Sequence, residues 1–218
     1  MLSFAEENYL KAIYHLSGEG KRSVTTNAIS DALKTKPASV SDMIRKLADK
    51  GMIKYEKYHG VRISDHGKKE ALVVIRKHRL WEVFLVKKLK FNWDEVHEIA
   101  EQLEHIRSGL LISRLDEFLG FPQYDPHGDP IPDKDGIIQT KPRLPLSKLN
   151  IGESGILISV NDSSDLFLQY LDKLKISIGA PIKILDRHEF DGSLEIIVDN
   201  KNKIFVSAAV AENLLVTK

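Results

Sequence analysis

The sequence has no cysteine among its 218 residues, which excludes disulfides, thiolate metal ligands and cysteine nucleophiles together. It also lacks a long apolar run: the longest aliphatic stretch, residues 71–75, is far too short to span a membrane, and no membrane partner is expected. The first ten residues contain two glutamates and no basic residue, so no signal peptide is expected and a cytoplasmic location is predicted. Hydrophobic residues make up 42% and charged residues 29%, values that exclude a disordered chain.

The net charge of +1 conceals an uneven distribution of charge along the chain. Residues 1–79 contain 16 Lys and Arg against 9 Asp and Glu, a net charge of +7. Residues 80–143 contain 8 against 12, which gives −4, and residues 144–218 contain 8 against 10, which gives −2. A basic first third indicates a polyanionic partner, and an acidic middle third indicates bound cations.

Composition and periodicity divide the chain into three predicted domains, residues 1–73, 74–143 and 144–218. The first has the pattern of helices followed by a hairpin. The second has two long predicted helices, 76–91 and 93–119, followed by a linker over 121–143 that holds five prolines. The third is predicted to form short strands. We therefore expect a mainly α protein with a small all-β C-terminal domain.

The first segment has the pattern of a winged helix-turn-helix. One apolar helical stripe ends near Gly18, and Thr25 or Thr26 can cap a second helix. Pro37 suits the start of a third helix, where its missing N–H is not needed. This third helix is predicted to bury Val40, Ile44 and Leu47. Two alternating strands then surround a predicted turn at His59 and Gly60, which completes the arrangement.

Small and polar side chains on the exposed face of the third helix would let it enter the major groove of DNA, about 12 Å wide. The predicted DNA-contacting residues on this helix and on the hairpin are Lys36, Pro37, Ser39, Ser41, Asp42, Arg45, Lys46, Lys57, His59 and Arg62. The alternative is a generic three-helix core whose charges are merely solvated.

The middle segment contains a concentration of histidines and glutamates. His97, Glu101, Glu104 and His105 are spaced at i, i+4, i+7 and i+8 on the predicted helix 93–119, and would span an arc of about 100°. His78 and Glu82 form another i, i+4 pair on the preceding helix. Imidazoles and carboxylates at such spacing suit a divalent metal. The alternative is a solvated face with ordinary helical Glu–His pairs.

These features combine in a resemblance to a known family. The segments EENYLKAIYHL, VSDMIRKLADKGMI, YHGVRISDHGKK, RKHRLWEVFL, VHEIAEQLEH and DPHGDPIP resemble the metal-dependent repressors of the diphtheria toxin repressor and iron-dependent regulator type, which include the manganese transport regulators. The tail, LPLSKLNIGESGILISV, is similar to the small barrel of the Src-homology-3 type in longer members and in the ferrous-iron transport accessory protein.

The resemblance implies two metal sites in each subunit. The implied primary ligands are Asn8, Glu101, Glu104 and His105, and the implied ancillary ligands are His78, Glu82 and His97. Some members add two ligands from the barrel, at the positions of Ser163 and Leu166 here. Because these two are poor ligands, nearby acids and histidines are candidate replacements: Asp125, His127, Asp162 and Asp165.

The resemblance also implies a metal, a partner and a function. The metal would be manganese(II) or iron(II): Glu101 matches the manganese-type members, whereas Asn8 stands where those members commonly have Asp. The short manganese regulators have a glutamate ligand where this chain has Lys11, so their second-ion arrangement is not expected. A homodimer would bind a palindromic operator when metal is present and repress metal-uptake genes, without enzymatic activity.

Three alternatives are distinguishable by experiment. The regulator can respond to iron instead of manganese. A metallohydrolase would use the Glu/His cluster, but the sequence offers it no nucleophile motif. In a third hypothesis, the last 75 residues form an interaction module for a transporter or a peptide. Prolines of the linker region (Pro130, Pro132, Pro142 and Pro145) could dock on the barrel intramolecularly instead.

Overall fold

The computed structural model describes residues 2–56, 60–139 and 142–218. The chain forms two compact units. The first comprises Met1–His78, Glu101–Ile112 and Pro132–Ile138, and the second comprises Arg79–Ala100, Ser113–Ile131 and Gln139–Lys218. The three domain boundaries expected from the sequence therefore stay a prediction.

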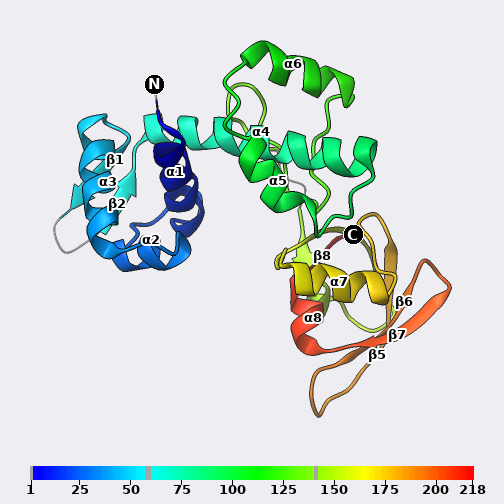
Figure 1. The fold of residues 1–218 in the computed structure, drawn as a ribbon. Helices are drawn as coiled ribbons and strands as arrows, with labels where there is room; N and C mark the ends of the chain where they lie inside the picture. The colour runs from blue at the N-terminus through cyan, green and yellow to red at the C-terminus, as the bar shows by residue number, and fades with distance from the viewer. Residues whose placement is uncertain (1, 57–59, 140–141) are drawn as a thin grey trace. The chain divides into compact units, whose positions relative to one another are not determined.

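Three helices and a hairpin begin the first unit (Figure 1). They are α1 (Phe4–Leu16), α2 (Thr26–Ala32), α3 (Pro37–Asp49), β1 (Ile53–Glu56) and β2 (Gly60–Ile63). The two strands pair antiparallel, and Val24 bridges to Val61. As predicted, Thr25 caps α2 by accepting a hydrogen bond from the Ala28 N–H, and α3 begins at Pro37. The predicted turn residue His59 lies outside the described residues.

The core of this unit explains the orientation of α3. Val40, Ile44 and Leu47 are buried, as the helical spacing predicts. They pack with fully buried Leu10 and Ile13 of α1. The opposite face of α3 is exposed. This helix-turn-helix with its hairpin confirms the predicted winged arrangement.

The helices of the middle segment differ from the expectation. They are α4 (Asp65–Leu89), α5 (Val96–Leu103) and α6 (Gly109–Phe118). The predicted helix 76–91 is only part of the longer α4. The single helix predicted over 93–119 is wrong, because the chain leaves the helix after Leu103 and Ser108 starts α6 by accepting a hydrogen bond from the Leu111 N–H. Glu104 and His105 therefore lie beyond α5, and the predicted helical arc of four ligands is also wrong.

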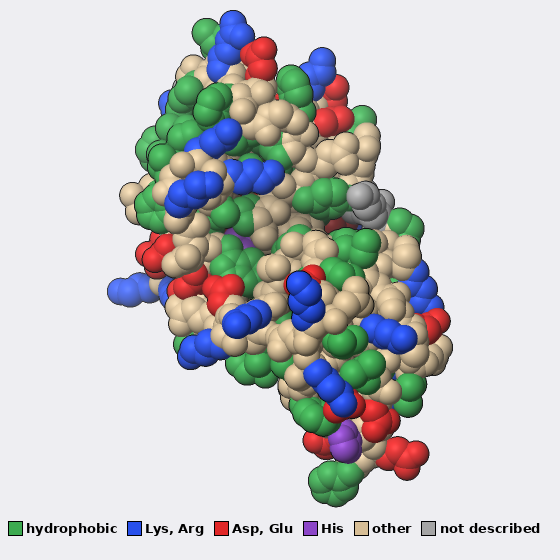
Figure 2. Space-filling view, turned by 90° about the vertical axis from the view of Figure 1, so that its right-hand side faces the viewer, with side chains coloured by type: hydrophobic (Ala, Val, Ile, Leu, Met, Phe, Trp, Pro, Cys, Tyr) green, Lys and Arg blue, Asp and Glu red, His purple; other side chains and the backbone are tan. Residues whose placement is uncertain are grey.

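Helix α6 leaves large apolar side chains uncovered. Leu110 is 72% exposed and Phe118 is 60% exposed, while Ile112 and Leu115 are buried. Helix α6 lies at the top of Figure 1, and in the upper part of Figure 2 hydrophobic side chains gather among basic ones. A helix that is apolar on two faces is typical of one that contacts a partner as well as its own core.

The C-terminal part contains a six-stranded antiparallel sheet in the order β3-β8-β4-β5-β6-β7. The strands are β3 (Leu144–Pro145), β4 (Ser154–Val160), β5 (Pro181–Arg187), β6 (Leu194–Val198), β7 (Asn202–Val206) and β8 (Leu214–Thr217). The 3₁₀ turn η1 (Leu146–Lys148) and the helices α7 (Asp165–Lys173) and α8 (Ala208–Asn213) lie between strands.

The sheet confirms the expected class, a helical N-terminal region with a β C-terminal domain. Helices α7 and α8 were not expected from the sequence. Leu168 and Leu171 of α7 and Ala211 of α8 are buried in the same core as the strands, so both helices close the sheet. Among the described residues, none of the helices combines the length and apolar character needed to cross a bilayer.

Candidate metal centres and nucleic-acid interface

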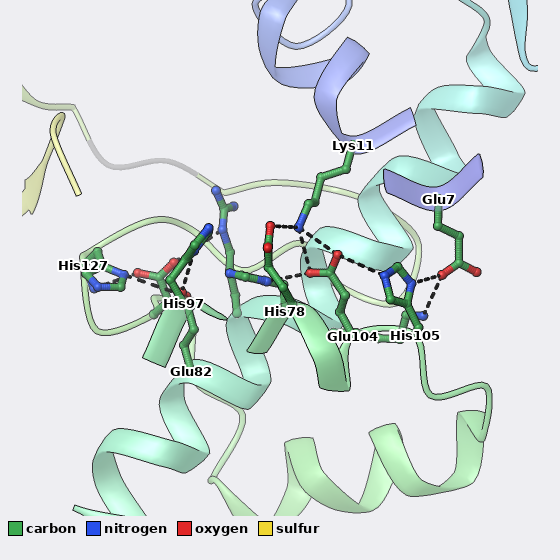
Figure 3. Close-up of polar contacts among 12 residues, drawn as sticks. Glu7, Lys11, His78, Glu82, His97, Glu104, His105 and His127 are labelled. Atoms are coloured by element: carbon green, nitrogen blue, oxygen red, sulfur yellow. Dashed lines mark hydrogen bonds and ion pairs between the residues drawn. The ribbon is translucent and has the colours of Figure 1, made fainter. Parts of the chain in front are cut away.

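A buried carboxylate, Glu104, is the centre of the first cluster, which lies wholly in the first unit (Figure 3). Its Oε1 and Oε2 lie 2.7 and 2.9 Å from the Lys11 ammonium of α1. Its Oε2 also lies 2.6 Å from Nδ1 of His78 in α4. Lys11 reaches Oε1 of Glu101, in α5, at 3.3 Å. We call Glu104, Lys11, His78, Glu101 and His105 the Glu104 cluster.

His105 completes this cluster on the side of α1. Its Nδ1 lies 2.6 Å from Oε2 of Glu7, and its Nε2 lies 3.8 Å from Oε1 of Glu104. The Phe4 ring stacks on the imidazole with centroids 4.8 Å apart. Asn8 is exposed, and polar contacts between α1 and the cluster come from Glu7 and Lys11. Glu7 was not expected to contact the site, whereas Lys11 stands where the resemblance gives the short manganese regulators a glutamate ligand.

The Glu104 carboxylate is ionised at neutral pH. Burial by itself raises the pKa of Glu104. The His78 hydrogen bond and the Lys11 charge together lower it by more than burial raises it, so the pKa lies below the ordinary value of 4.5. The cluster therefore consists of hard oxygen and borderline nitrogen donors, with its central negative charge paired to the Lys11 ammonium. This donor set fits a divalent metal.

A second cluster, in the second unit, surrounds Glu82 of α4 (Figure 3). One potential ligand atom from each of Glu82, Asp125 and His127 lies within 4.8 Å of the others, and all three residues are buried. Nδ1 of His127 is 3.8 Å from Oε2 of Glu82, and Nδ1 of His97 is 3.6 Å from Oε1 of Glu82. We call Glu82, His97, Asp125 and His127 the Glu82 cluster.

The hydrogen bond of His127 leaves its Nδ1 able to bind a cation. Its Nε2 lies 2.8 Å from the Trp93 carbonyl oxygen, which only accepts, so Nε2 bears the hydrogen. In the neutral ring Nδ1, which faces Glu82, then has the lone pair. Metal-binding histidines in proteins commonly donate their other N–H to a carbonyl in this way. The Trp93 ring stacks on the imidazole and holds its plane.

Negative charge is in excess in the Glu82 cluster. Burial, together with the carboxylates of Glu82 and Asp129, raises the pKa of Asp125 well above its ordinary range. The Arg79 guanidinium, 3.4 Å from Asp125, opposes this rise only in part. Oδ1 of Asp125 accepts hydrogen bonds from the N–H groups of His127 and Asp129, which fold the loop around it. Two buried carboxylates with oxygens within 4.8 Å of each other favour the binding of a cation between them.

The barrel approaches this cluster through residues that follow β4. His97 lines a hollow of about 500 Å³ together with Asn161, Asp162, Ser163, Ser164 and Asp165. Asp162 and Ser163, two residues expected near the site, thus face the same hollow as His97. Leu166, at the second position implied by the resemblance, is 82% exposed and offers no ligand atom.

The structure divides the predicted ligands between the two clusters. Glu101, Glu104 and His105 come together in the first, with His78 bonded to Glu104. Glu82, His97, Asp125 and His127 come together in the second. His78 precedes Glu82 by four residues on α4. The Glu7 contact has a sequence signal that is visible only with hindsight, because Glu7 adjoins Asn8 on the helix that was expected to supply a ligand. Lys11 stands at a position that the resemblance had already linked to a metal ligand in the short manganese regulators.

The predicted DNA-contacting residues share one property: those whose side chains are described are exposed. They are Lys36, Pro37, Ser39, Ser41, Asp42, Arg45, Lys46 and Arg62. Lys57 and His59 lie outside the described residues. Asp42 forms an ion pair with Arg45 one turn later, which keeps an acidic group beside the basic face.

A winged helix-turn-helix combined with buried carboxylate–histidine clusters defines a metal-responsive DNA-binding regulator. Family models agree along nearly the whole chain. Residues 1–61 match the iron dependent repressor N-terminal DNA binding domain, residues 64–133 match the iron dependent repressor metal binding and dimerisation domain, and residues 144–218 match the FeoA domain.

Individual relatives give the same result. The diphtheria toxin repressor of Corynebacterium diphtheriae is 26% identical over 207 residues, covering 90% of this chain and 89% of that protein. The iron-dependent repressor IdeR of Mycobacterium leprae is 32% identical over 126 residues, 58% of this chain and 54% of that protein. A manganese-dependent transcriptional repressor solved in complex with manganese is 34% identical, covers 98% of this chain and 99% of that chain, and superposes with a TM-score of 0.85.

The chain belongs to this family of metal-dependent, DNA-binding transcriptional repressors. The expected regulator is therefore confirmed over a metallohydrolase, because the family consists of repressors and not of enzymes. The family domains also support DNA as a partner and a dimeric assembly.

Proposed function

We propose that this protein represses metal-uptake genes when manganese(II) binds to it, as a homodimer on a palindromic operator. The observation that supports this proposal is the Glu104 cluster. It joins α1, on which the DNA-binding helices pack, to α4 and to the segment after α5 within one compact unit. Whatever binds Glu104 therefore acts on the position of α1.

Glu101, Glu104 and His105 would hold the primary ion, with the Asn8 amide oxygen as a donor from α1. A bound divalent ion supplies two positive charges, which balance the two glutamates. With ligands on both sides, the chain would be held in one arrangement of α1 relative to the segment after α5. By linkage, metal and operator must then strengthen each other's binding by the same factor.

The ancillary site of the proposal consists of Glu82, His97, Asp125 and His127, with Asp162 lining the adjoining hollow. We keep His78, a neighbour of Glu82 one turn earlier on α4, as a further proposed ligand. Two sites per subunit follow. The ancillary site ties the loop of Asp125 and His127 to α4, so it should mainly stiffen the second unit.

Manganese is favoured over iron by the chemistry of the primary donors. Glu101, Glu104, His105 and Asn8 offer carboxylate, imidazole and amide groups, and none offers a thiolate or thioether, the soft ligands that would favour iron. The related manganese-dependent repressor supports this choice, whereas the mycobacterial IdeR is described as iron-dependent. Iron(II) is the alternative activator.

The linker and barrel have a proposed structural role instead of binding an external peptide. The His127 carbonyl oxygen accepts a hydrogen bond from the Val160 N–H of β4 at 3.2 Å. At Gly128, a Cβ would lie 1.8 Å from the Ile158 carbonyl oxygen, so the loop approaches β4 too closely for any side chain. These contacts support intramolecular docking of the segment that contains Pro130 on the barrel.

Operator binding by mobility shift across a series of divalent metals, with chelator as the control, tests the function. We expect binding only with metal, with Mn²⁺ or Fe²⁺ sufficient at cellular levels. Because manganese is the weakest binder in the divalent series, zinc or cobalt should bind at least as tightly in vitro. Metal-independent binding, or none with any metal, would contradict the proposal.

The double reversal Arg45→Glu and Lys46→Glu tests the DNA interface. Both side chains are exposed, so the fold and the dimer should survive while operator binding is lost. Lys21→Glu, an exposed charge reversal outside α3, is the control for a reversal elsewhere on the surface. Unchanged affinity of the double variant at moderate salt would refute the assignment of α3 as the recognition helix.

A further inference from the structure

Lys11 occupies the centre of the Glu104 cluster. Its ammonium contacts both oxygens of Glu104, at 2.7 and 2.9 Å, and one oxygen of Glu101, at 3.3 Å. The family resemblance assigns both glutamates to the primary metal site, yet it assigns no role to a lysine here. An ammonium has three donors, and these three contacts match them in number.

The location of this cation makes its charge effective. Glu104 is fully buried, and the Lys11 side chain is only 14% exposed, so water and salt screen the pair little. A divalent ion bound to the same two oxygens would lie within a few ångströms of the ammonium and repel it. Because Glu104 also accepts from His78, both of its oxygens already have a partner without any metal.

We propose that Lys11 is a tethered cation that competes with the metal for Glu104 and Glu101, and so sets the metal concentration at which the repressor is activated. This inference rests on the proposed primary site. In the metal-free protein the Lys11 ammonium balances the buried carboxylate and keeps α1 in contact with the segment after α5. Metal binding requires that Lys11 give up Glu104.

The competition predicts a gain of metal affinity when the charge is removed. Without Lys11, the buried Glu104 carboxylate loses the ammonium that contacts both of its oxygens and keeps only the His78 imidazole as a partner, which makes the metal-free state less favourable. The metal-bound state has no need of the lysine. Metal affinity at the primary site should therefore increase, by about tenfold for each 1.4 kcal/mol of lost pairing.

Titration of the full-length protein with Mn²⁺, following the electron paramagnetic resonance signal of the free ion, tests the proposal. Lys11→Met should bind Mn²⁺ at least about tenfold more tightly at one of two sites. Lys11→Arg, which keeps the charge and the donors, should stay within about threefold of the unchanged protein. The Glu82 cluster serves as an internal control, because its affinity should not change. Lys21→Met, which removes an exposed lysine paired with Glu19, should alter neither site.

The outcomes separate this inference from the proposed function. If the unchanged protein binds no Mn²⁺, the proposed function fails. If it binds two ions but Lys11→Met binds with unchanged or weaker affinity, or Lys11→Arg gains as much as Lys11→Met, the tethered-cation inference alone is overturned. Should Lys11→Met fail to fold, Lys11→Gln, whose amide still donates to Glu104 without a charge, is titrated in its place and judged by the same criterion.

A second readout follows thermal stability instead of the free-ion signal. The melting temperature of metal-free Lys11→Met should fall below that of the unchanged protein, and saturating Mn²⁺ should restore it, so the metal-induced shift becomes larger. An equal shift in both proteins would overturn the competition.

Discussion

The two carboxylate–histidine clusters differ in how their negative charge is balanced. In the Glu104 cluster, the buried carboxylate contacts Lys11 and His78, and its pKa lies below the ordinary value. In the Glu82 cluster, Asp125 and Glu82 are buried together and the pKa of Asp125 is raised, with burial the largest cause. One cluster has its own counter-charge, and the other has a deficit of positive charge.

This difference suggests different tasks. A site with an internal cation responds to metal by exchanging one cation for another, which changes what α1 is bonded to. A site with excess negative charge gains stability directly when a cation binds, without displacing a group of the chain. The first is suited to sensing and the second to structural support, and variants can test this division.

The largest effect is expected from Glu104→Ala. It removes the carboxylate that joins α1, α4 and the segment after α5, so metal-dependent operator binding should be abolished. Glu82→Ala should only weaken activation, because its cluster lies in the other unit. Mobility shifts with and without Mn²⁺ measure both, and Glu98→Ala, an exposed position on α5, is the control. If Glu82→Ala abolished activation and Glu104→Ala kept it, the two tasks would be reversed.

Neutral amides at the two buried carboxylates should have opposite effects on the metal-free protein. Glu104→Gln leaves Lys11 and His78 without their anion and should destabilise it by about 2–3 kcal/mol. Asp125→Asn relieves the repulsion with Glu82 while keeping a side-chain oxygen for the loop N–H groups, so it should stabilise by about 1 kcal/mol. Urea unfolding in the presence of chelator measures the signs. Equal signs would remove the contrast between the clusters.

Local signals in the sequence are enough to predict the DNA-binding part of the fold. Thr25 at a helix cap, Pro37 at a helix start and the spacing of Val40, Ile44 and Leu47 all indicate the same arrangement, and the structure agrees. Helix α7 is missed because it interrupts a strand-rich segment. Its signals are short: Ser164 and Asp165 at its start, and Leu168 with Leu171 on one face.

The break between α5 and α6 shows why the site is harder to predict than the fold. The segment from Glu104 to Ser108 has no proline, and only Ser108 and Gly109 signal a new helix. Glu104 is held out of the helix by partners 93 and 26 residues away, Lys11 and His78. Residue types at local spacing indicate candidate ligands, but long-range ion pairs determine how these side chains are arranged.

Glu101 is the proposed ligand through which metal preference can be changed with least disturbance, because its side chain is 50% exposed. Glu101→Cys introduces a soft thiolate and should shift the ratio of activation from manganese toward iron by about tenfold, or about 1.4 kcal/mol. Anaerobic mobility shifts with Mn²⁺ and Fe²⁺ in parallel measure this ratio. If Mn²⁺ failed to activate the unchanged protein while Fe²⁺ succeeded, the manganese assignment would be wrong.

The smallest effect is expected from a second lysine–glutamate pair that involves α1. This pair includes no histidine and no proposed ligand. Lys50 of the α3 terminus contacts both oxygens of Glu6, at 2.7 and 2.8 Å. Burial raises the pKa of Glu6. The hydrogen bonds from Lys50 and from the Ser3 N–H together lower it by more than burial raises it, so the pKa is below its ordinary value of 4.5.

Because the folded-state pKa of Glu6 is depressed, the stability that this pair contributes is present above about pH 4.5 and is lost as pH falls through the folded pKa. Lys50→Met should therefore destabilise the protein by about 1 kcal/mol at pH 7, and by less at pH values below 4.5. The effect is small because Lys50 is 42% exposed and solvent screens its charge. Urea unfolding with and without Mn²⁺ measures the difference.

Unlike the change at Lys11, the destabilisation by Lys50→Met should be the same with and without Mn²⁺, because Glu6 has no metal to exchange for its lysine. A metal-dependent difference at Lys50 would show that any lysine paired with or placed on this part of α1 affects metal binding, and the distinction between the pairs would fail.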